Sequence, residues 1–151
     1  MNGTGLVRAP SSRLAEGIVT HIRRTAVDVA QARAQHAAYA GALAACGWMI
    51  AQAPAAEDCP DSVFIEDTVV VCEDLAVLAR PGAPARRGEV AGVAGILRSM
   101  GLRTAAIQEP GTLDGGDVLQ AGHTVYVGAA GGPTVRASAS YARCWRRWAA
   151  P

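Results

Sequence analysis

The chain has 151 residues, half of them apolar, and 14 basic against 13 acidic side chains leave a formal net charge of +1. This length suffices for one domain with its own core, and the composition favours a soluble globular protein. No stretch approaches the about 20 uncharged apolar residues that span a membrane, and the polar N-terminus MNGTGLVRAPSSR has no apolar segment typical of a secretory signal.

The cysteines point to a reducing environment. They are widely spaced and form no CxxC pair. This spacing favours reduced thiols in a cytoplasmic protein over disulfides or a zinc site. The four residues are Cys46, Cys59, Cys72 and Cys144.

The first elements predicted along the chain are a helix and a short strand. Residues 27–46 are rich in alanine and repeat apolar side chains at helical spacing. Gly47 fits the position just after a helix C-terminus, and residues 48–51 are predicted to be a strand. The face expected to pack consists of Val29, Ala32, His36, Tyr39 and Leu43.

The middle of the chain predicts a ββαβ unit. Residues 63–72 and 75–79 are rich in β-branched side chains, and the polar pair at 73–74 predicts a tight turn between two strands. A Pro/Gly-rich loop, an amphipathic helix at 89–100 and a strand at 104–108 are expected next. A second hairpin, at 118–120 and 124–127, could begin another copy. The pattern therefore favours an α/β protein built from small ββαβ units.

Three carboxylates lie within or just before the strand predicted at 63–72. In CPDSVFIEDTVVV, residues 59–71, Asp61, Glu66 and Asp67 lie among apolar side chains. Removing carboxylates from water is costly unless they are paired with a cation or hydrogen-bonded. In a regular strand Glu66 and Asp67 point to opposite faces, so both reach one ligand only if the strand twists or bulges. From the pattern alone, Asp61 also fits a turn cap and Glu66 a surface ion pair.

A family resemblance gives these acids a partner. PDSVFIEDTVVV (60–71), RPGAPARRGE (80–89) and PGTLDGGDVL followed by TVYVG (110–128) occur in this order. Together they resemble the dimethylarginine dimethylaminohydrolases of the guanidino-modifying superfamily, over about residues 5–131. The resemblance implies an α/β propeller of pentein type made of ββαβ modules, of which residues 1–131 are an incomplete, N-terminal part. Residues 132–151 are a basic, Trp-containing tail without a match.

In that family a Cys thiolate attacks the guanidinium carbon of methylated arginine and a His serves as general acid and base, giving citrulline and a methylamine. A planar guanidinium, which donates in a fixed fork, suits ionised carboxylates. The resemblance implies that Asp67 grips the guanidinium, that Asp61 and Glu66 brace this grip, and that Asp114 orients the catalytic His. The implied substrate-binding set is Ile18 (in a mobile lid), Asp61, Phe64 (a pocket wall), Glu66, Asp67 and Arg86 (on the substrate carboxylate).

The catalytic Cys and His of the family fall beyond the last residue of this chain. None of His21, His36 and His123 matches the family's position, and Cys59 is interpreted as a packed thiol. We therefore expect the chain to be inactive alone, with no metal and no organic cofactor. Half a propeller leaves strand edges open, so self-association is expected; neither nucleic acid nor membrane is an expected partner.

The tail has two interpretations. The family's GRTN is absent after residue 131, and with GC-rich codons a single-base deletion near Gly131 would account for this, because the alternative frame restores Arg-Thr-Asn followed by an amphipathic helix. Alternatively, arginines interleaved with Tyr141, Trp145 and Trp148 bind nucleic acid.

Two alternative functions stay open from the sequence. Arginine deiminases and amidinotransferases share the acid-rich strand, although the PDSVFIED and RRGE pairing favours dimethylargininases. A non-catalytic module that binds arginine-like ligands, or that assembles with a partner supplying the missing half, is the other.

Overall fold

The computed structural model describes residues 3–121, 124–129 and 132–138. The chain divides into two compact units, Met1–Ile65 and Glu66–Pro151. None of the helices in these described ranges is long and apolar enough to cross a membrane.

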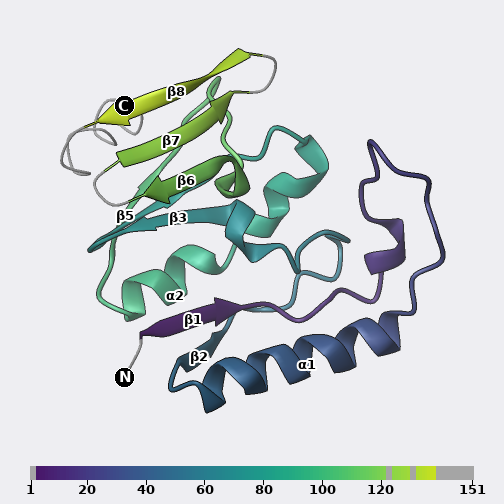
Figure 1. The fold of residues 1–151 in the computed structure, drawn as a ribbon. Helices are drawn as coiled ribbons and strands as arrows, with labels where there is room; N and C mark the ends of the chain where they lie inside the picture. The colour runs from purple at the N-terminus through teal and green to yellow at the C-terminus, as the bar shows by residue number, and fades with distance from the viewer. Residues whose placement is uncertain (1–2, 122–123, 130–131, 139–151) are drawn as a thin grey trace. The chain divides into compact units, whose positions relative to one another are not determined.

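The first unit is built around a parallel strand pair connected by a helix (Figure 1). β1 (Thr4–Val7) pairs with β2 (Met49–Gln52), and α1 (Val29–Ala45) precedes β2 and packs against it. Asp28 caps α1 by accepting the Gln31 N–H at 2.9 Å, and Gly47 (φ 88°) takes the left-handed conformation beyond its end. The predicted helix and following strand are confirmed.

One member of the expected helix face is wrong. Val29, Ala32, His36 and Leu43 are half-buried, but Tyr39 is 58 % exposed. Ala40 is half-buried in its place. At 100° per residue, positions 39 and 40 lie on opposite sides of the stripe formed by 29, 32, 36 and 43, so helical spacing alone does not decide which of the two is covered.

Polar contacts, some buried and some exposed, fix the loop that follows β2. Arg8, fully buried, donates from Nε to the Pro54 carbonyl at 3.0 Å. Glu57 accepts the N–H and the hydroxyl of Ser12, both at 2.7 Å. These contacts attach residues 54–62 to the chain that leaves β1, and so position the start of the acid-rich segment.

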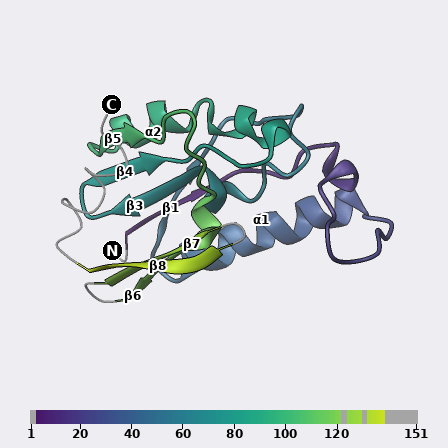
Figure 2. The same cartoon turned by 90° about the horizontal axis from the view of Figure 1, so that it is seen from above.

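The second unit contains two three-stranded sheets (Figures 1 and 2). In the first, β3 (Val69–Cys72) pairs antiparallel with β4 (Leu75–Leu78), and β4 pairs parallel with β5 (Arg103–Ala106) after the crossover helix α2 (Val93–Ser99). The second is antiparallel: β6 (Val118–Ala121), β7 (Thr124–Ala129) and β8 (Gly132–Ser138). The core comprises Val70, Cys72, Val77, Ile107, Leu113 and Val125.

The order β3, β4, α2, β5 confirms the predicted ββαβ unit, and the predicted hairpin is β6–β7. Its turn at residues 122–123 lies outside the described residues, as do residues 139–151 of the tail. Of the predicted tail, residues 132–151, the structure describes only Gly132–Ser138, which form β8. Glu73 has φ 54°, consistent with the tight turn predicted between the first two strands.

Two predicted boundaries are wrong. Residues 63–68 are not strand, because Ile65–Thr68 forms a 3-10 helix, η2, and the ladder begins only at Val69. The predicted helix at 89–100 is also shorter. Pro84–Val90 forms a separate 3-10 helix, η3, and α2 starts after Gly92, whose φ of 80° interrupts the helix.

Candidate functional site

The candidate residues of the first unit lie around one buried carboxylate. Asp61 is only 8 % exposed, and its two oxygens accept the Ile18 N–H at 3.0 and 3.2 Å. The Cα of Gly17, the residue before Ile18, lies so close to Asp61 that a methyl group there would overlap Oδ1. The acid therefore holds the segment after η1 (Leu14–Glu16) in place.

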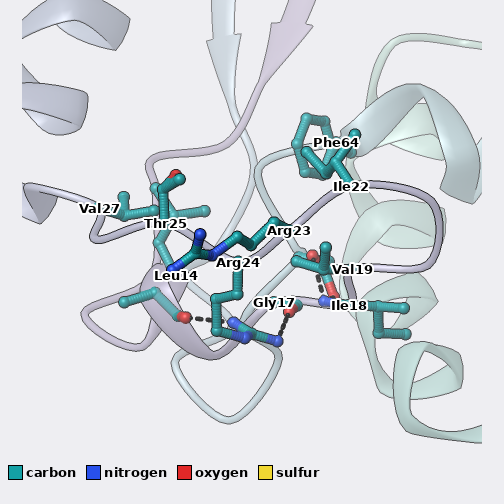
Figure 3. Close-up of a pocket in the computed structure, with 12 residues that line it drawn as sticks. Leu14, Gly17, Ile18, Val19, Ile22, Arg23, Arg24, Thr25, Val27 and Phe64 are labelled. Carbon is teal, nitrogen blue, oxygen red and sulfur yellow. Dashed lines mark hydrogen bonds between the residues drawn. The ribbon is translucent and has the colours of Figure 1, made fainter.

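A pocket of about 250 Å³ opens beside Asp61 (Figure 3). Ile18, which is 49 % exposed, and Phe64, which is 47 % exposed, both line it. Arg24 closes the loop by donating to the Gly17 carbonyl at 2.7 Å and to that of Ala15. The pocket combines an apolar wall with a buried carboxylate, an arrangement typical of small-molecule sites.

In the second unit, Asp67 binds a guanidinium of the same chain. Its Oδ2 accepts from Arg86 Nη1 at 2.7 Å, and its Oδ1 accepts the Gly116 N–H at 2.9 Å. Arg86 also forms a fork to Glu89, with Nε–Oε1 at 3.0 Å and Nη2–Oε2 at 2.8 Å. Burial by itself lowers the pKa of Arg86, but the hydrogen bonds to Glu89 and Asp67 outweigh it and hold that pKa above its usual value.

The 3-10 turn at Ile65–Thr68 separates the two adjacent acids. Asp67 is half-buried, with its side chain 18 % exposed, whereas Glu66 is exposed. Gly115 lies so close to the Glu66 carbonyl that a side chain at position 115 cannot fit. Asp114 is half-buried, and its Oδ2 accepts the Gly82 N–H at 3.2 Å.

The structure thus brings the predicted residues together in two groups. Ile18, Asp61 and Phe64 share the pocket of the first unit. Asp67 contacts Arg86 in the second, and Asp114 lies two residues before the glycine that binds Asp67. Glu66 joins no such contact among the described residues. The roles of these residues toward a substrate stay predictions.

Two residues of the Asp67 contact were missed from the sequence. Glu89 and Gly116 hold Arg86 and Asp67, respectively. The spacing of Arg86 and Glu89, three residues apart, suits an ion pair within a helical turn and could have indicated the first. The Gly115-Gly116 pair, interpreted only as turn residues, carried no sign of the second. Among the described residues, no group of three or more His, Cys, Asp or Glu is placed to hold a metal ion.

Replacing Gly17 by alanine should loosen the contact between Asp61 and Ile18. The new methyl group meets the Asp61 carboxylate and lies 3.2 Å from the Leu14 carbonyl, so the acid must turn away from the Ile18 N–H. We expect Gly17→Ala to lower the free energy of unfolding by about 1–2 kcal/mol and to speed hydrogen exchange at the Ile18 amide.

Gly41→Ala is the matched control, because Gly41 lies inside α1 and a methyl group there meets nothing within 4 Å. It should leave the Ile18 amide unchanged. An unaltered exchange rate in Gly17→Ala as well would contradict the tight approach of Gly17 to Asp61.

Comparison with known proteins defines first a class and then a family. No protein-family model matches the chain. An arginine dihydrolase N-terminal domain from cyanobacteria superposes with a TM-score of 0.75 at 17 % identity, over 95 % of this chain and 53 % of that one. This likeness concerns the fold alone and places the chain among the α/β proteins of pentein type.

The chain is also similar in sequence to dimethylarginine dimethylaminohydrolases. The Streptomyces coelicolor enzyme is 53 % identical over 126 residues, 83 % of this chain and 49 % of the relative. The Pseudomonas aeruginosa enzyme is 36 % identical over 125 residues, 82 % of this chain and 48 % of the relative. A structure of a mutant Pseudomonas aeruginosa enzyme complexed with citrulline gives a TM-score of 0.78 at 34 % identity, over 94 % and 54 % of the two chains.

The chain is a homologue of the dimethylarginine dimethylaminohydrolases, which confirms the resemblance predicted from the sequence. It spans about half the length of the curated relatives it matches.

Proposed function

We propose that this chain carries guanidinium-binding residues of a hydrolase that converts N-methylated arginine to citrulline and a methylamine. The observation that carries the proposal is the pair of Asp67 with the guanidinium of Arg86 at 2.7 Å. A half-buried carboxylate at this position already accepts hydrogen bonds from the functional group that defines the substrate. The 53 % identity to a dimethylarginine dimethylaminohydrolase supports the same substrate class.

The proposed roles follow the family positions. Asp67 binds the substrate guanidinium, Glu66 supports it from the same turn, and Arg86 reaches the substrate carboxylate. Asp114 orients the general-acid His, which the resemblance puts outside residues 1–131. In the first unit, the substrate-binding residues are Ile18, Asp61 and Phe64, which line one pocket.

The Cys nucleophile has no counterpart in the matched residues, so binding and turnover are expected to separate. An intact enzyme of this type adds a thiolate to the guanidinium carbon, releases the methylamine with a proton from His, and hydrolyses the adduct with water. In this chain the substrate-binding residues stabilise the bound substrate, but they supply neither the nucleophile nor the general acid.

We expect the 151-residue polypeptide to bind arginine and dimethylarginine without producing citrulline. Ligand that binds only the folded state raises the unfolding temperature in a concentration-dependent way. Thermal unfolding with increasing arginine, dimethylarginine and, as a cation control, lysine should show a shift for the first two ligands only. Colorimetric detection of citrulline in the same samples measures turnover.

The outcomes separate the alternatives. Citrulline formed by the purified polypeptide would contradict the expected inactivity. Binding without turnover supports a guanidinium-binding module, and equal shifts with lysine would contradict guanidinium recognition. A cytoplasmic location and self-association through strand edges, both expected from the sequence, stay predictions.

A further inference from the structure

Arg86 and Glu89 form a deeply buried ion pair. The Glu89 side chain is 1 % exposed and that of Arg86 14 %. Both carboxylate oxygens of Glu89 accept from the Arg86 guanidinium, at 3.0 and 2.8 Å. The two residues stand three apart in η3, and side chains at this spacing nearly eclipse each other in a 3-10 helix. The local helix therefore aligns the carboxylate and the guanidinium for a fork-to-fork contact.

Arg86 is consequently held by its own helix, whether or not Asp67 is present. Removing one partner of a buried pair leaves a costly uncompensated charge, so the fork to Glu89 is a strong constraint on the guanidinium. The neighbouring Arg87 has no such constraint: it is exposed, and its Nε donates to the Pro81 carbonyl at 3.2 Å. Two adjacent arginines thus have different roles.

The guanidinium held in this way fixes one oxygen of Asp67, and a backbone N–H fixes the other. Oδ2 accepts from Arg86 and Oδ1 from Gly116. A carboxylate has about four lone-pair positions, so two such contacts orient it and leave acceptor capacity for a ligand. Orientation matters because bidentate recognition of a second guanidinium needs the carboxylate plane to be set in advance.

We propose that Glu89 and Arg86 are positioning residues for Asp67: Glu89 clamps Arg86, and Arg86 sets the carboxylate that receives the substrate guanidinium. This inference rests on the proposed function and extends it, because it gives Arg86 a role that does not depend on the carboxylate of the substrate. Affinity for any guanidinium ligand, with or without a carboxylate, then depends on Glu89.

The test compares two ligands and a ligand-free probe in the 151-residue chain. Arginine carries a carboxylate, and agmatine has the same guanidinium without one. Glu89→Gln keeps the shape of the side chain but removes its charge and one acceptor oxygen. We expect it to weaken the binding of both ligands by a similar factor, about tenfold. In the free protein, the amide resonance of Gly116 should shift because Asp67 is no longer held from the Arg86 side.

Arg87→Gln is the matched control, since it removes the adjacent charge but not the clamp, and it should change neither affinity nor the Gly116 resonance. Arg86→Lys is the second variant if Glu89→Gln does not fold, because lysine keeps the charge and cannot form the fork; it should also weaken both ligands. Loss of arginine affinity alone would overturn the proposal in favour of a role confined to the substrate carboxylate. An unchanged Gly116 resonance in a folded variant would overturn the proposal too. This measurement needs no ligand, so it tests the proposal even if the wild-type chain binds neither arginine nor agmatine. Failure of the wild-type chain to bind either ligand would contradict the proposed function instead.

Discussion

Asp67→Asn is expected to weaken the binding of arginine by roughly 10- to 100-fold, the range for losing a hydrogen bond with a charged acceptor. The amide has nearly the shape of the carboxylate but only one acceptor oxygen. It cannot accept from both Arg86 and the Gly116 N–H, so at one of these contacts the amide NH₂ faces another hydrogen-bond donor. The negative charge that a guanidinium ligand needs is also lost. Isothermal titration calorimetry measures the affinity directly.

Asp74→Asn provides the comparison. Asp74 also pairs with an arginine, Arg103, at 2.7 Å, but both side chains are more than 60 % exposed. A pair this open to water is screened and contributes little, so the affinity for arginine should equal that of the wild-type chain. Equal affinities in Asp67→Asn and Asp74→Asn would show that Asp67 is not the guanidinium-binding acid.

Gly115→Ala is expected to destabilise the fold by about 2–3 kcal/mol, the upper part of the range for overpacking. Its methyl group would overlap the Glu66 carbonyl oxygen and lie 3.3 Å from the Val69 carbonyl. Both obstacles are backbone atoms, at the junction of η2 and β3, and cannot rotate away as a side chain does. The free energy of unfolding in urea measures the loss.

Gly95→Ala tests whether the effect belongs to the position. Gly95 lies within α2, and a methyl group there meets nothing within 4 Å. Alanine should stabilise the helix there by up to about 1 kcal/mol. If the two variants have equal stabilities, the backbone contact between Gly115 and Glu66 does not constrain the fold.

Regular elements with a strong local pattern were predictable. The helical periodicity before Gly47 corresponds to α1, and the β-branched runs correspond to β3, β4 and β7. Local apolar patterning specifies such elements because each of them buries one face against its neighbours. The prediction failed where polar contacts, rather than apolar packing, determine the local structure. The segment 65–68 has the β-branched content of a strand, but it forms a 3-10 turn in which the Asp67 carboxylate accepts from Arg86 and from the Gly116 N–H.

By itself, the sequence determined the ββαβ order, the family, and the presence of an acid suited to a guanidinium at position 67. These depend on residue types and on their spacing along the chain. Only the tertiary structure decided that Asp67 meets Arg86 and the Gly116 N–H, and that Glu89 lies behind Arg86. Arg86 and Gly116 are 19 and 49 residues away from Asp67 in sequence. Hydrogen bonds and ion pairs depend on distances of a few ångströms in space, which spacing along the chain does not give.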